Sequence, residues 1–432
     1  MEQILEVAKK HAQQAEVFSI SLDETPVHFE ANRLKHIQGK QEQSLALRII
    51  KDGKIGYATS SSNNNRELVD MALETAHFGQ EVSFDLPEIN EYPQVDIYDQ
   101  NTGNIPLETM IEIGEELIGK LRKASKDIIC QAQVAKSTIC VSLINSSGFK
   151  AQYNKSLFSI AIEGSLIRGT DMLFVGDSLS SCRPITSTKN LTDTVLKQLE
   201  YANILAPITT GTLPVIFTPQ GVASAIIPSL ATAFNGKVVL EGASPIGDKL
   251  GKVVFDRRFS LYDNPTLPFK PRSRPFDDEG IPSRNTPLII KGKVSSFFYD
   301  LKTASQAKTK STGNGQRAGS GMPGPSPSAL VISPGDTDFL DMVADIKEGL
   351  VVEYLMGAEQ GNILSGDFSG NVLLGYKIEN GRIAGRVKNT MLHGNIYQSL
   401  NNLVAIGNDW RWVGGSLKTP SLYFSRLSVA AK

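Results

Sequence analysis

The N-terminal part of the chain alternates between segments whose apolar residues recur at helical spacing and segments with the pattern of strands. In the opening segment, Ile4, Leu5 and Ala8 stand on one predicted helical face. Two strand-like runs then flank Asp52-Gly53, a dipeptide typical of tight hairpins. Because predicted helices and hairpins are interleaved, we expect an α+β domain with a largely antiparallel sheet over residues 1–205. The further predicted helices cover residues 65–79, 106–125 and 191–205, and the strands 15–22, 43–61, 127–135, 137–145 and 156–166.

The pattern changes near Pro207, where glycine and proline become frequent and short strand-like runs dominate. Asn380-Gly381 lies between two of these runs and predicts another hairpin. A helical pattern over residues 337–350 interrupts them. We therefore expect residues 206–432 to form a second, mostly β domain with a curved or barrel-like sheet. A length of 432 residues agrees with two domains, because it exceeds what one hydrophobic core usually supports.

Composition and charge exclude several classes of protein. The shares of apolar residues (41%) and charged residues (21%) are those of a globular protein. Lysine and arginine (44) balance aspartate and glutamate (45), so the sequence does not favour direct contact with nucleic acid. No apolar run is long enough to cross a membrane. The N-terminal residues lack the apolar block of a signal peptide, so we expect a cytoplasmic protein.

Two of the three cysteines raise the question of a covalent or metal link. Cys130 and Cys140 lie at equal distances from a predicted turn at residues 135–137, where they would face each other across a hairpin. A disulfide or half of a metal site is one interpretation, but no Cys-x-x-Cys motif or nearby histidine supports it. Buried, reduced thiols are the preferred interpretation.

The loop at residues 308–328 contains the residue types of a phosphate loop in Lys310-Ser311-Thr312-Gly313. A Walker loop needs the glycine-rich backbone first and the helix after the lysine. Here a predicted helix over 300–308 comes first and a stretch of Pro, Gly and Ser follows. The order argues against a nucleotide site, and we expect a mobile or partner-contacting loop.

An acidic run at Asp277, Asp278 and Glu279 precedes a turn that begins at Gly280. Adjacent carboxylates can bind a hard cation or provide a catalytic acid and base. The alternative is a solvated acidic turn, and both interpretations predict that the run is exposed. The five histidines are scattered without the i, i+4 spacing of a zinc helix, and no Gly-x-Ser-x-Gly elbow is present.

The central segment GVASAIIPSLATAFNG, residues 221–236, contains no residue that could bind a metal through nitrogen or sulfur, and no charged residue. Pro228 stands where a continuous helix would least accommodate it. The segment is either ordinary core or a site from which the chemistry is missing.

Several motifs of the C-terminal half resemble the TldD/PmbA family, often labelled modulators of DNA gyrase. The resemblance rests on residues 276–318, with FDDEG followed by STGN, on GNILSGDFSGNVLLGYKIENGRIAGRV at 361–387, and on GNIYQSLNNLVAIGNDWRW at 394–412. It implies a two-domain subunit that pairs with a related one. It also implies that TldD-type subunits are zinc metallopeptidases with a His-Glu-x-x-x-His helix and a cysteine ligand near the C-terminus. Alignment through Gly236 places Ile227, Pro228 and Thr232 at the His, Glu and His positions.

The resemblance therefore identifies this chain with the PmbA/TldE-type partner. We expect no cofactor or bound metal, because Ile, Pro and Thr cannot replace imidazoles and a general base. The expected partners are a zinc-bearing TldD-type homologue, a second copy of this chain, or both, and an extended peptide held by strand edges. The matching motifs suggest a substrate or partner surface at Asp277, Asp278, Glu279, Gly280, Lys310, Ser311, Thr312, Asp367, Gly394 and Asn395.

Three alternatives remain open at this stage. The chain could be a peptidase with displaced ligands, or a homodimeric peptide-binding or regulatory protein. The gyrase label suggests DNA regulation, which the balanced charge disfavours. Asp278 and Lys310 could also form a structural ion pair instead of a functional site.

Overall fold

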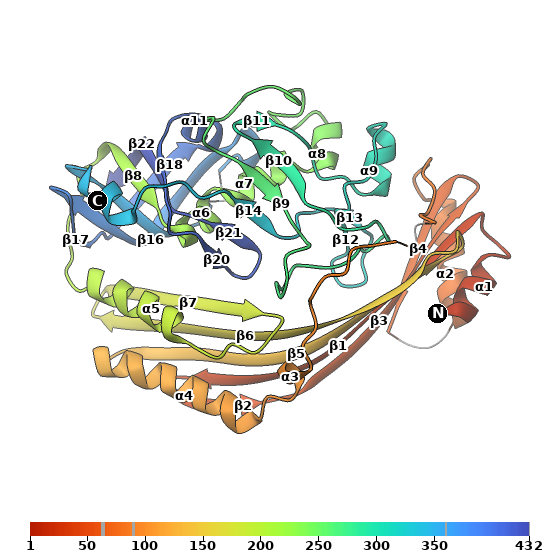
Figure 1. Cartoon of the computed structure of the whole chain (residues 1–432), viewed down its shortest axis with the longest axis horizontal. Coiled ribbons are helices and arrows are strands. Elements are labelled where there is room, and N and C mark those ends of the chain that lie inside the picture. Colours follow the sequence, from red (N-terminus) through yellow and green to blue (C-terminus); the bar gives the residue numbers. More distant parts are fainter. Residues whose placement is uncertain (62–64, 89–90, 359–360, 432) are drawn as a thin grey trace.

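A computed structural model describes residues 1–61, 65–88, 91–358 and 361–431. The N-terminal part forms a curved sheet, and the C-terminal part lies against its concave side (Figure 1). The mixed α+β class expected from the sequence is confirmed.

The N-terminal sheet is antiparallel throughout, in the order β4-β3-β1-β5-β6-β7, with β2 paired to β1. Asp52 and Gly53 have positive φ and join β3 to β4, so the predicted hairpin is confirmed. The turn after Asn145 joins β5 to β6. The strands are β1 (Gln14–Glu30), β2 (Arg33–Ile37), β3 (Lys40–Lys51), β4 (Lys54–Ser60), β5 (Ile129–Asn145), β6 (Lys150–Arg168) and β7 (Asp171–Ser181).

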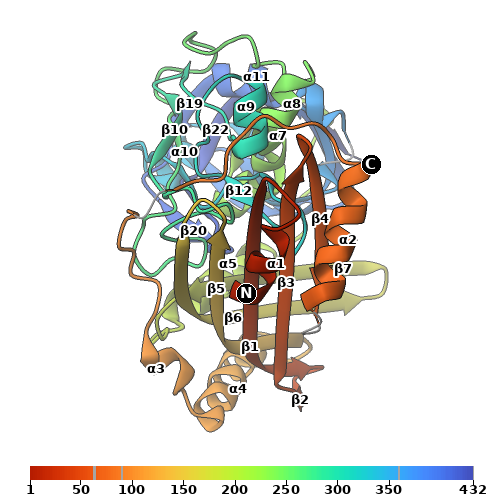
Figure 2. The same ribbon diagram turned by 90° about the vertical axis from the view of Figure 1, so that its right-hand side faces the viewer.

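Helices cover the two ends of this sheet. Helices α1 (Glu2–Ala8) and α2 (Asn65–His77) bury apolar residues against β1, β3 and β4 at one end (Figure 2). At the other end, α4 (Leu107–Ala124) and α5 (Lys189–Tyr201) pack on β5, β6 and β7. The short helix α3 (Gln100–Gly103) precedes α4, and the Asp99 side chain caps it by accepting from the Asn101 N–H.

The expected hairpin between the two cysteines is wrong, because β5 runs without a turn from Ile129 to Asn145. Residues 135–137 pair with β1 on one side and with β6 on the other, so the strand has no reason to reverse there. Cys130 and Cys140 are thus about 33 Å apart along one strand, at roughly 3.3 Å per residue. Both are free thiols, and burial raises the pKa of Cys130 to about 11.

The barrel-like sheet expected in the C-terminal part is a closed five-stranded barrel in the order β15-β8-β22-β18-β16, with β16 paired back to β15. Strand β17 extends it through the predicted hairpin at Asn380-Gly381, where both residues have positive φ. The strands are β8 (Gly211–Phe217), β15 (Glu348–Met356), β16 (Asp367–Glu379), β17 (Arg382–Arg386), β18 (Thr390–Asn395), β19 (Leu403–Ile406) and β22 (Leu422–Ala431).

Shorter strands and helices surround the barrel. A six-stranded sheet contains β11 (Lys293–Val294), β10 (Thr286–Ile290), β9 (Leu261–Asp263), β14 (Leu330–Ile332), β21 (Leu417–Thr419) and β20 (Arg411–Val413). Strands β12 (Gly315–Gln316) and β13 (Gly324–Pro325) form a separate ladder. The helices are α6 (Pro219–Ala225), α7 (Ile227–Ala233), α8 (Gly236–Leu240), α9 (Leu301–Gln306), α10 (Phe339–Ala344), α11 (Ile396–Asn401) and the 3-10 turn η2 (Ile363–Ser365).

The C-terminal part therefore contains more short helices than its sequence pattern predicted. The helix expected over 337–350 is also wrong at its C-terminal end, because α10 ends at Ala344 and β15 begins at Glu348. Leu350 pairs with Val215 of β8 in the barrel. This strand pairing decides the structure of residues 348–350, although their apolar residues continue the helical spacing.

One hydrophobic core joins the two parts of the chain. It contains Val134 and Ile160 of the N-terminal sheet together with Ile216, Val351 and Tyr376 of the barrel. The division of the chain between residues 205 and 206 stays a prediction. Among the described helices, none combines the length and apolar character needed to cross a membrane.

Candidate functional site

The segment at the family's metal position forms two short helices that meet at Ile226. Thr218 caps α6 by accepting from the Gly221 N–H, and Pro228 lies in the first turn of α7. A proline at that place lacks only an N–H that a first helical turn leaves unpaired. The predicted interruption of the helix at Pro228 is confirmed.

The side chains at this place do not fit a zinc ion. Ile227 and Pro228 are partly exposed, and their side chains carry no lone pair that could bind a metal. The Thr232 hydroxyl, also partly exposed, donates to the Pro228 carbonyl at 2.9 Å. Zinc sites in proteins are built from imidazole, thiolate and carboxylate ligands. Within the described ranges, no group of three or more His, Cys, Asp or Glu residues is placed to hold a metal ion.

The acidic turn is buried, which corrects the expectation that it is exposed. Asp277 and Glu279 are both 0% exposed. One oxygen of Asp277 accepts from the Glu279 and Ile281 N–H groups at 3.0 and 2.9 Å, and the other accepts from Gly315 at 2.8 Å. Burial raises the pKa of Asp277 to about 6. Asp277 thus shapes its own turn and holds the 308–328 loop against it.

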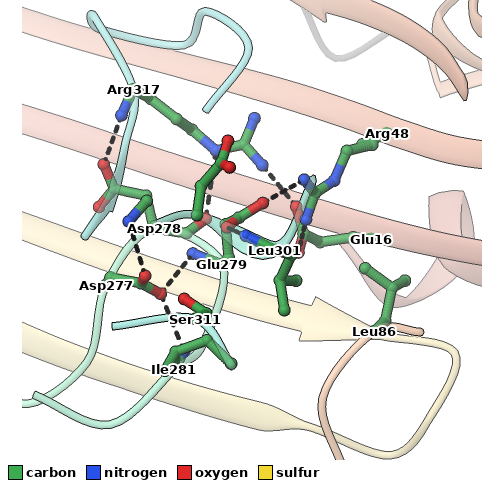
Figure 3. Close-up of polar contacts among 12 residues, drawn as sticks. Glu16, Arg48, Leu86, Asp277, Asp278, Glu279, Ile281, Leu301, Ser311 and Arg317 are labelled. Atoms are coloured by element: carbon green, nitrogen blue, oxygen red, sulfur yellow. Dashed lines mark hydrogen bonds and ion pairs between the residues drawn. The ribbon is translucent and has the colours of Figure 1, made fainter. Parts of the chain in front are cut away.

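Glu279 reaches across to the N-terminal sheet (Figure 3). Its Oε1 accepts from Arg48 Nη1 at 2.5 Å, and its Oε2 accepts from the Leu301 N–H at 2.7 Å. Arg48 also donates to Glu16 at 2.8 Å, and Arg317 of the loop donates to the other oxygen of Glu16. These four residues, Glu16, Arg48, Glu279 and Arg317, are called the clasp below, because they join the N-terminal sheet to the turn and the loop.

The electrostatics of the clasp follow from its burial. Burial raises the pKa of Glu279 to about 8, more than the neighbouring Arg48 lowers it. Burial would lower the pKa of Arg48, but Glu16 and Glu279 raise it above its ordinary value. The Arg317 guanidinium lies 4.9 Å from the centre of the Phe18 ring and 5.8 Å from that of Tyr57. The Arg48 guanidinium lies 5.4 Å from the centre of the Phe84 ring. Both arginines thus have carboxylate partners and aromatic neighbours, which offset the cost of burying a cation.

Asp278 and the residues of the loop complete this junction. Asp278 accepts from the Arg317 N–H at 2.8 Å and lies 3.5 Å from Arg274. The alternative pairing of Asp278 with Lys310 is therefore wrong, and Lys310 is exposed. The Ser311 hydroxyl donates to the Tyr299 carbonyl at 3.0 Å, and the Thr312 hydroxyl accepts from the Tyr299 N–H at 2.8 Å.

The structure thus brings together the DDEG turn and the STGN loop, two parts of the family motif that are separated in the sequence. Their contacts lie inside this chain, and Gly280, with φ of +83°, packs beside Leu143 of β5 and Phe149 of the turn between β5 and β6. Asp277, Glu279 and Gly280 lie in the interior of the described chain. Their assignment to a substrate or partner surface stays a prediction.

A second group of predicted residues lines one polar pocket at the barrel. Asp367 of β16 and Asn395 of β18 are direct partners in the ladder. Asn395 Nδ2 donates to Asp367 at 2.8 Å, and the Ser365 hydroxyl donates to the other oxygen at 2.7 Å. Hydrogen bonds from Asn395 and Ser365 lower the pKa of Asp367. Gly394 packs so closely against its ladder partner Phe368 that a Cβ there would stand 2.6 Å from the Phe368 ring.

The pocket has a volume of about 540 Å³ and lies beside a bulge of β22. His393, Gln398 and Arg426 lie in its lining together with Asp367 and Asn395. In the described part of β22, the pairing with β8 passes from Phe424 directly to Leu427. Residues 425 and 426 between them form a bulge, outside the register with β8. A pocket with carboxylate, amide and guanidinium groups beside such backbone can bind a polar, extended chain.

Sequence reasoning missed Glu16 and Arg48. A signal was available, because Glu16 stands in AEVFS and Arg48 in LALRII, each a charge within an apolar strand. Charged residues are almost never fully buried unless they are paired. Two opposite charges in neighbouring strands therefore indicate a buried ion pair.

Comparison with known proteins gives consistent matches. A family model described as the PmbA/TldA metallopeptidase C-terminal domain matches residues 210–431, and one described as domain 1 matches residues 15–77. An uncharacterized protein of Methanocaldococcus jannaschii is 24% identical over 98% of both chains. A protein named metalloprotease PmbA homolog, from Haemophilus influenzae, is 23% identical over 99% of this chain and 94% of its own.

The fold is shared with a solved structure. TldE from Thermococcus kodakarensis aligns with a TM-score of 0.90 and 22% identity over 100% of both chains. At that identity the likeness establishes the architecture alone.

Proposed function

Because this chain belongs to the PmbA/TldA metallopeptidase family, we propose that it is the subunit without a zinc site in a peptidase complex. A zinc-bearing homologue would supply the hydrolytic centre, and this chain would help to bind extended peptides. The observation that carries the proposal is the chemistry of Ile227, Pro228 and Thr232, which provide neither ligands nor a general base.

The polar pocket at Asp367 and Asn395 supports a role in peptide binding. An extended peptide needs backbone hydrogen-bond partners and few fixed side-chain contacts. The bulge of β22 beside the pocket supports the former, because its residues Ser425 and Arg426 are exposed and stand outside the register with β8. We propose that this segment, with Asp367, Gly394 and Asn395, forms part of the substrate surface.

The test is co-expression with the zinc-bearing homologue from the same genome. We expect hydrolysis of an unstructured peptide when both chains are present and none from this chain alone. Thr232→Val in the complex should leave the rate unchanged, because the Thr232 hydroxyl donates to the Pro228 carbonyl of its own helix. Stoichiometric zinc in this chain together with peptide hydrolysis by it alone would overturn the proposal in favour of displaced ligands. Co-purification of only further copies of this chain would overturn it in favour of a homodimer.

A further inference from the structure

A second cleft lies between the N-terminal sheet and the barrel. One wall is formed by β5, β6 and β7, and the other by β15 and β16, with a volume of about 480 Å³. Figure 1 shows β6 and β7 running beneath the barrel near β16 and β17. The cleft is separate from the pocket at Asp367, and the two share no lining residue.

Two ion pairs hold the walls of this cleft in place. Arg386 of β17 binds both carboxylate oxygens of Asp171, at the start of β7, at 2.5 and 2.6 Å. Arg411 of β20 donates to Asp177, near the middle of β7, at 2.9 Å. A cleft fixed in this way costs a ligand little reorganisation.

Large apolar side chains face the cleft while remaining accessible. Ile129 and Phe174 on the sheet side are 44% and 40% exposed, and Tyr354 on the barrel side is 40% exposed. Leu373 of the barrel is partly buried beside them. Such surfaces on opposite walls favour a ligand that inserts apolar groups between them.

The charge of the cleft is negative. Its lining contains Glu163, Asp177 and Glu353, and none of the described residues that line it is lysine, arginine or histidine. Arg411 neutralises Asp177. Glu353 accepts one hydrogen bond, from the Thr218 hydroxyl at 2.9 Å, and within the described chain neither Glu353 nor Glu163 has an ion-pair partner.

Burial raises the pKa of Glu353. Nearby Arg411 and Lys197 lower this pKa by less than burial raises it. Arg411 forms its ion pair with Asp177, and the Lys197 ammonium lies over the rings of Tyr201 and Phe339 at 5.4 and 6.0 Å. A carboxylate that is partly withdrawn from water and has no ion-pair partner of its own is stabilised when a ligand brings a cation.

We propose that this cleft binds a basic peptide segment, with a lysine or arginine side chain at Glu353 and Glu163 and its apolar neighbours against Ile129, Phe174 and Tyr354. The proposal rests on the proposed function in one respect, that the chain handles extended peptides. It adds a preference for segments in which a basic residue stands next to apolar ones.

The test is fluorescence anisotropy with the purified full chain and two labelled unstructured peptides. One carries Leu-Lys-Leu at its centre, and the other carries acetyl-lysine in place of the lysine. We expect acetylation to weaken binding about tenfold, the usual size of one hydrogen bond to a charged group. Equal dissociation constants for the two peptides would overturn the proposal without any variant.

Variants locate the charge recognition. Glu353→Gln keeps the shape of the side chain. It should weaken binding of the lysine peptide about tenfold and change binding of the acetyl-lysine peptide less than about twofold. Glu115→Gln, on the exposed face of α4 and outside the cleft, should change neither. An equal effect of Glu353→Gln on both peptides would overturn the assignment of Glu353.

A free polyamine carries the same ammonium groups, so spermidine serves as competitor. We expect it to displace the peptide at least tenfold less effectively than the unlabelled peptide does, because it lacks the apolar side chains. If spermidine and the unlabelled peptide displace the labelled peptide equally well, the cleft would be assigned to polyamines and the proposal of a peptide ligand would be overturned. These binding measurements use this chain alone and need no homologue. If the complex with the zinc-bearing homologue hydrolyses no peptide, the proposed function is refuted, but the proposal for the cleft is not affected.

Discussion

Replacing Arg48 with methionine tests the clasp most directly. Arg48 is 2% exposed and forms ion pairs with Glu16 and Glu279, which are 0% exposed. Methionine fills most of the volume but leaves both carboxylates without this cation. Each hydrogen bond to a charged group contributes about 1.5–3 kcal/mol. Breaking a buried ion pair from one side costs about 3–5 kcal/mol.

Protonation limits the loss, because the pKa of Glu279 is already raised to about 8. We therefore expect Arg48→Met to lower the free energy of unfolding by about 3–5 kcal/mol at pH 8, with a smaller loss at pH 6. The assay is urea denaturation followed by far-UV circular dichroism at both pH values.

Arg168→Met is the matched control, since Arg168 is exposed at the end of β6. It should change the free energy of unfolding by less than about 0.5 kcal/mol. Adding Glu279→Gln to Arg48→Met should recover part of the loss, because Glu279 then carries no charge while Glu16 keeps its ion pair with Arg317. A loss from Arg48→Met no larger than that from Arg168→Met would refute the reasoning.

Three further predictions follow from the described contacts. The pKa of Glu279 is raised from 4.5 to about 8, so between these pH values the folded protein holds a proton that the unfolded chain has released, and stability falls as pH rises, by at most about 1.4 kcal/mol per unit. Glu279→Gln should flatten the dependence of the free energy of unfolding on pH, measured by urea denaturation at pH 6, 7 and 8. An unchanged slope would contradict the assignment of this dependence to Glu279. Gly394→Ala should lower stability by about 1–3 kcal/mol, because its Cβ would meet the Phe368 ring at 2.6 Å. Thermal denaturation measures both variants, and Gly119→Ala, in open space on α4, should be neutral or stabilising by up to about 1 kcal/mol. Equal effects of the two substitutions would contradict the crowding at Gly394. Asn395→Ala removes the N-cap of α11 and a hydrogen bond to Asp367, so it should cost about 1–2 kcal/mol and raise the pKa of Asp367 in an NMR titration. An unchanged Asp367 pKa would show that Asn395 does not hold it down.

Local patterns in the sequence predicted most of the elements. Alternation and turn residues were sufficient for the hairpins at Asp52-Gly53 and Asn380-Gly381, because these turns depend on two residues that favour positive φ. The local sequence pattern gave wrong predictions where pairing with strands distant in sequence determines the structure. Residues 135–137 look like a turn, but ladders on both sides keep them extended.

The site was predictable only in part. The family motif linked the DDEG turn to the STGN loop, and the structure joins them through Asp277 and Gly315. Burial of the acidic run could not be inferred from the run itself, because the arginines that pair with Glu16 and Glu279 stand far away in sequence. The cleft at Glu353 was also out of reach, since its two walls come from strands that no local pattern brings together.

The order of strands in the barrel has a consequence for synthesis on the ribosome. Strand β8 leaves the exit tunnel first, yet its neighbours in the finished barrel are Leu350–Val352 and the stretch that ends at Val429, more than two hundred residues after Gly211. At about 5–20 residues per second, the edge that pairs with β22 waits on the order of 10–40 s for its partner, and the edge that pairs with β15 waits somewhat less. During that interval the nascent chain exposes an apolar ribbon, Val215–Phe217, to any other strand in the cell. Efficient production of this protein should therefore depend on chaperones that occupy nascent chains, and more strongly than production of a barrel whose strands pair in sequence order.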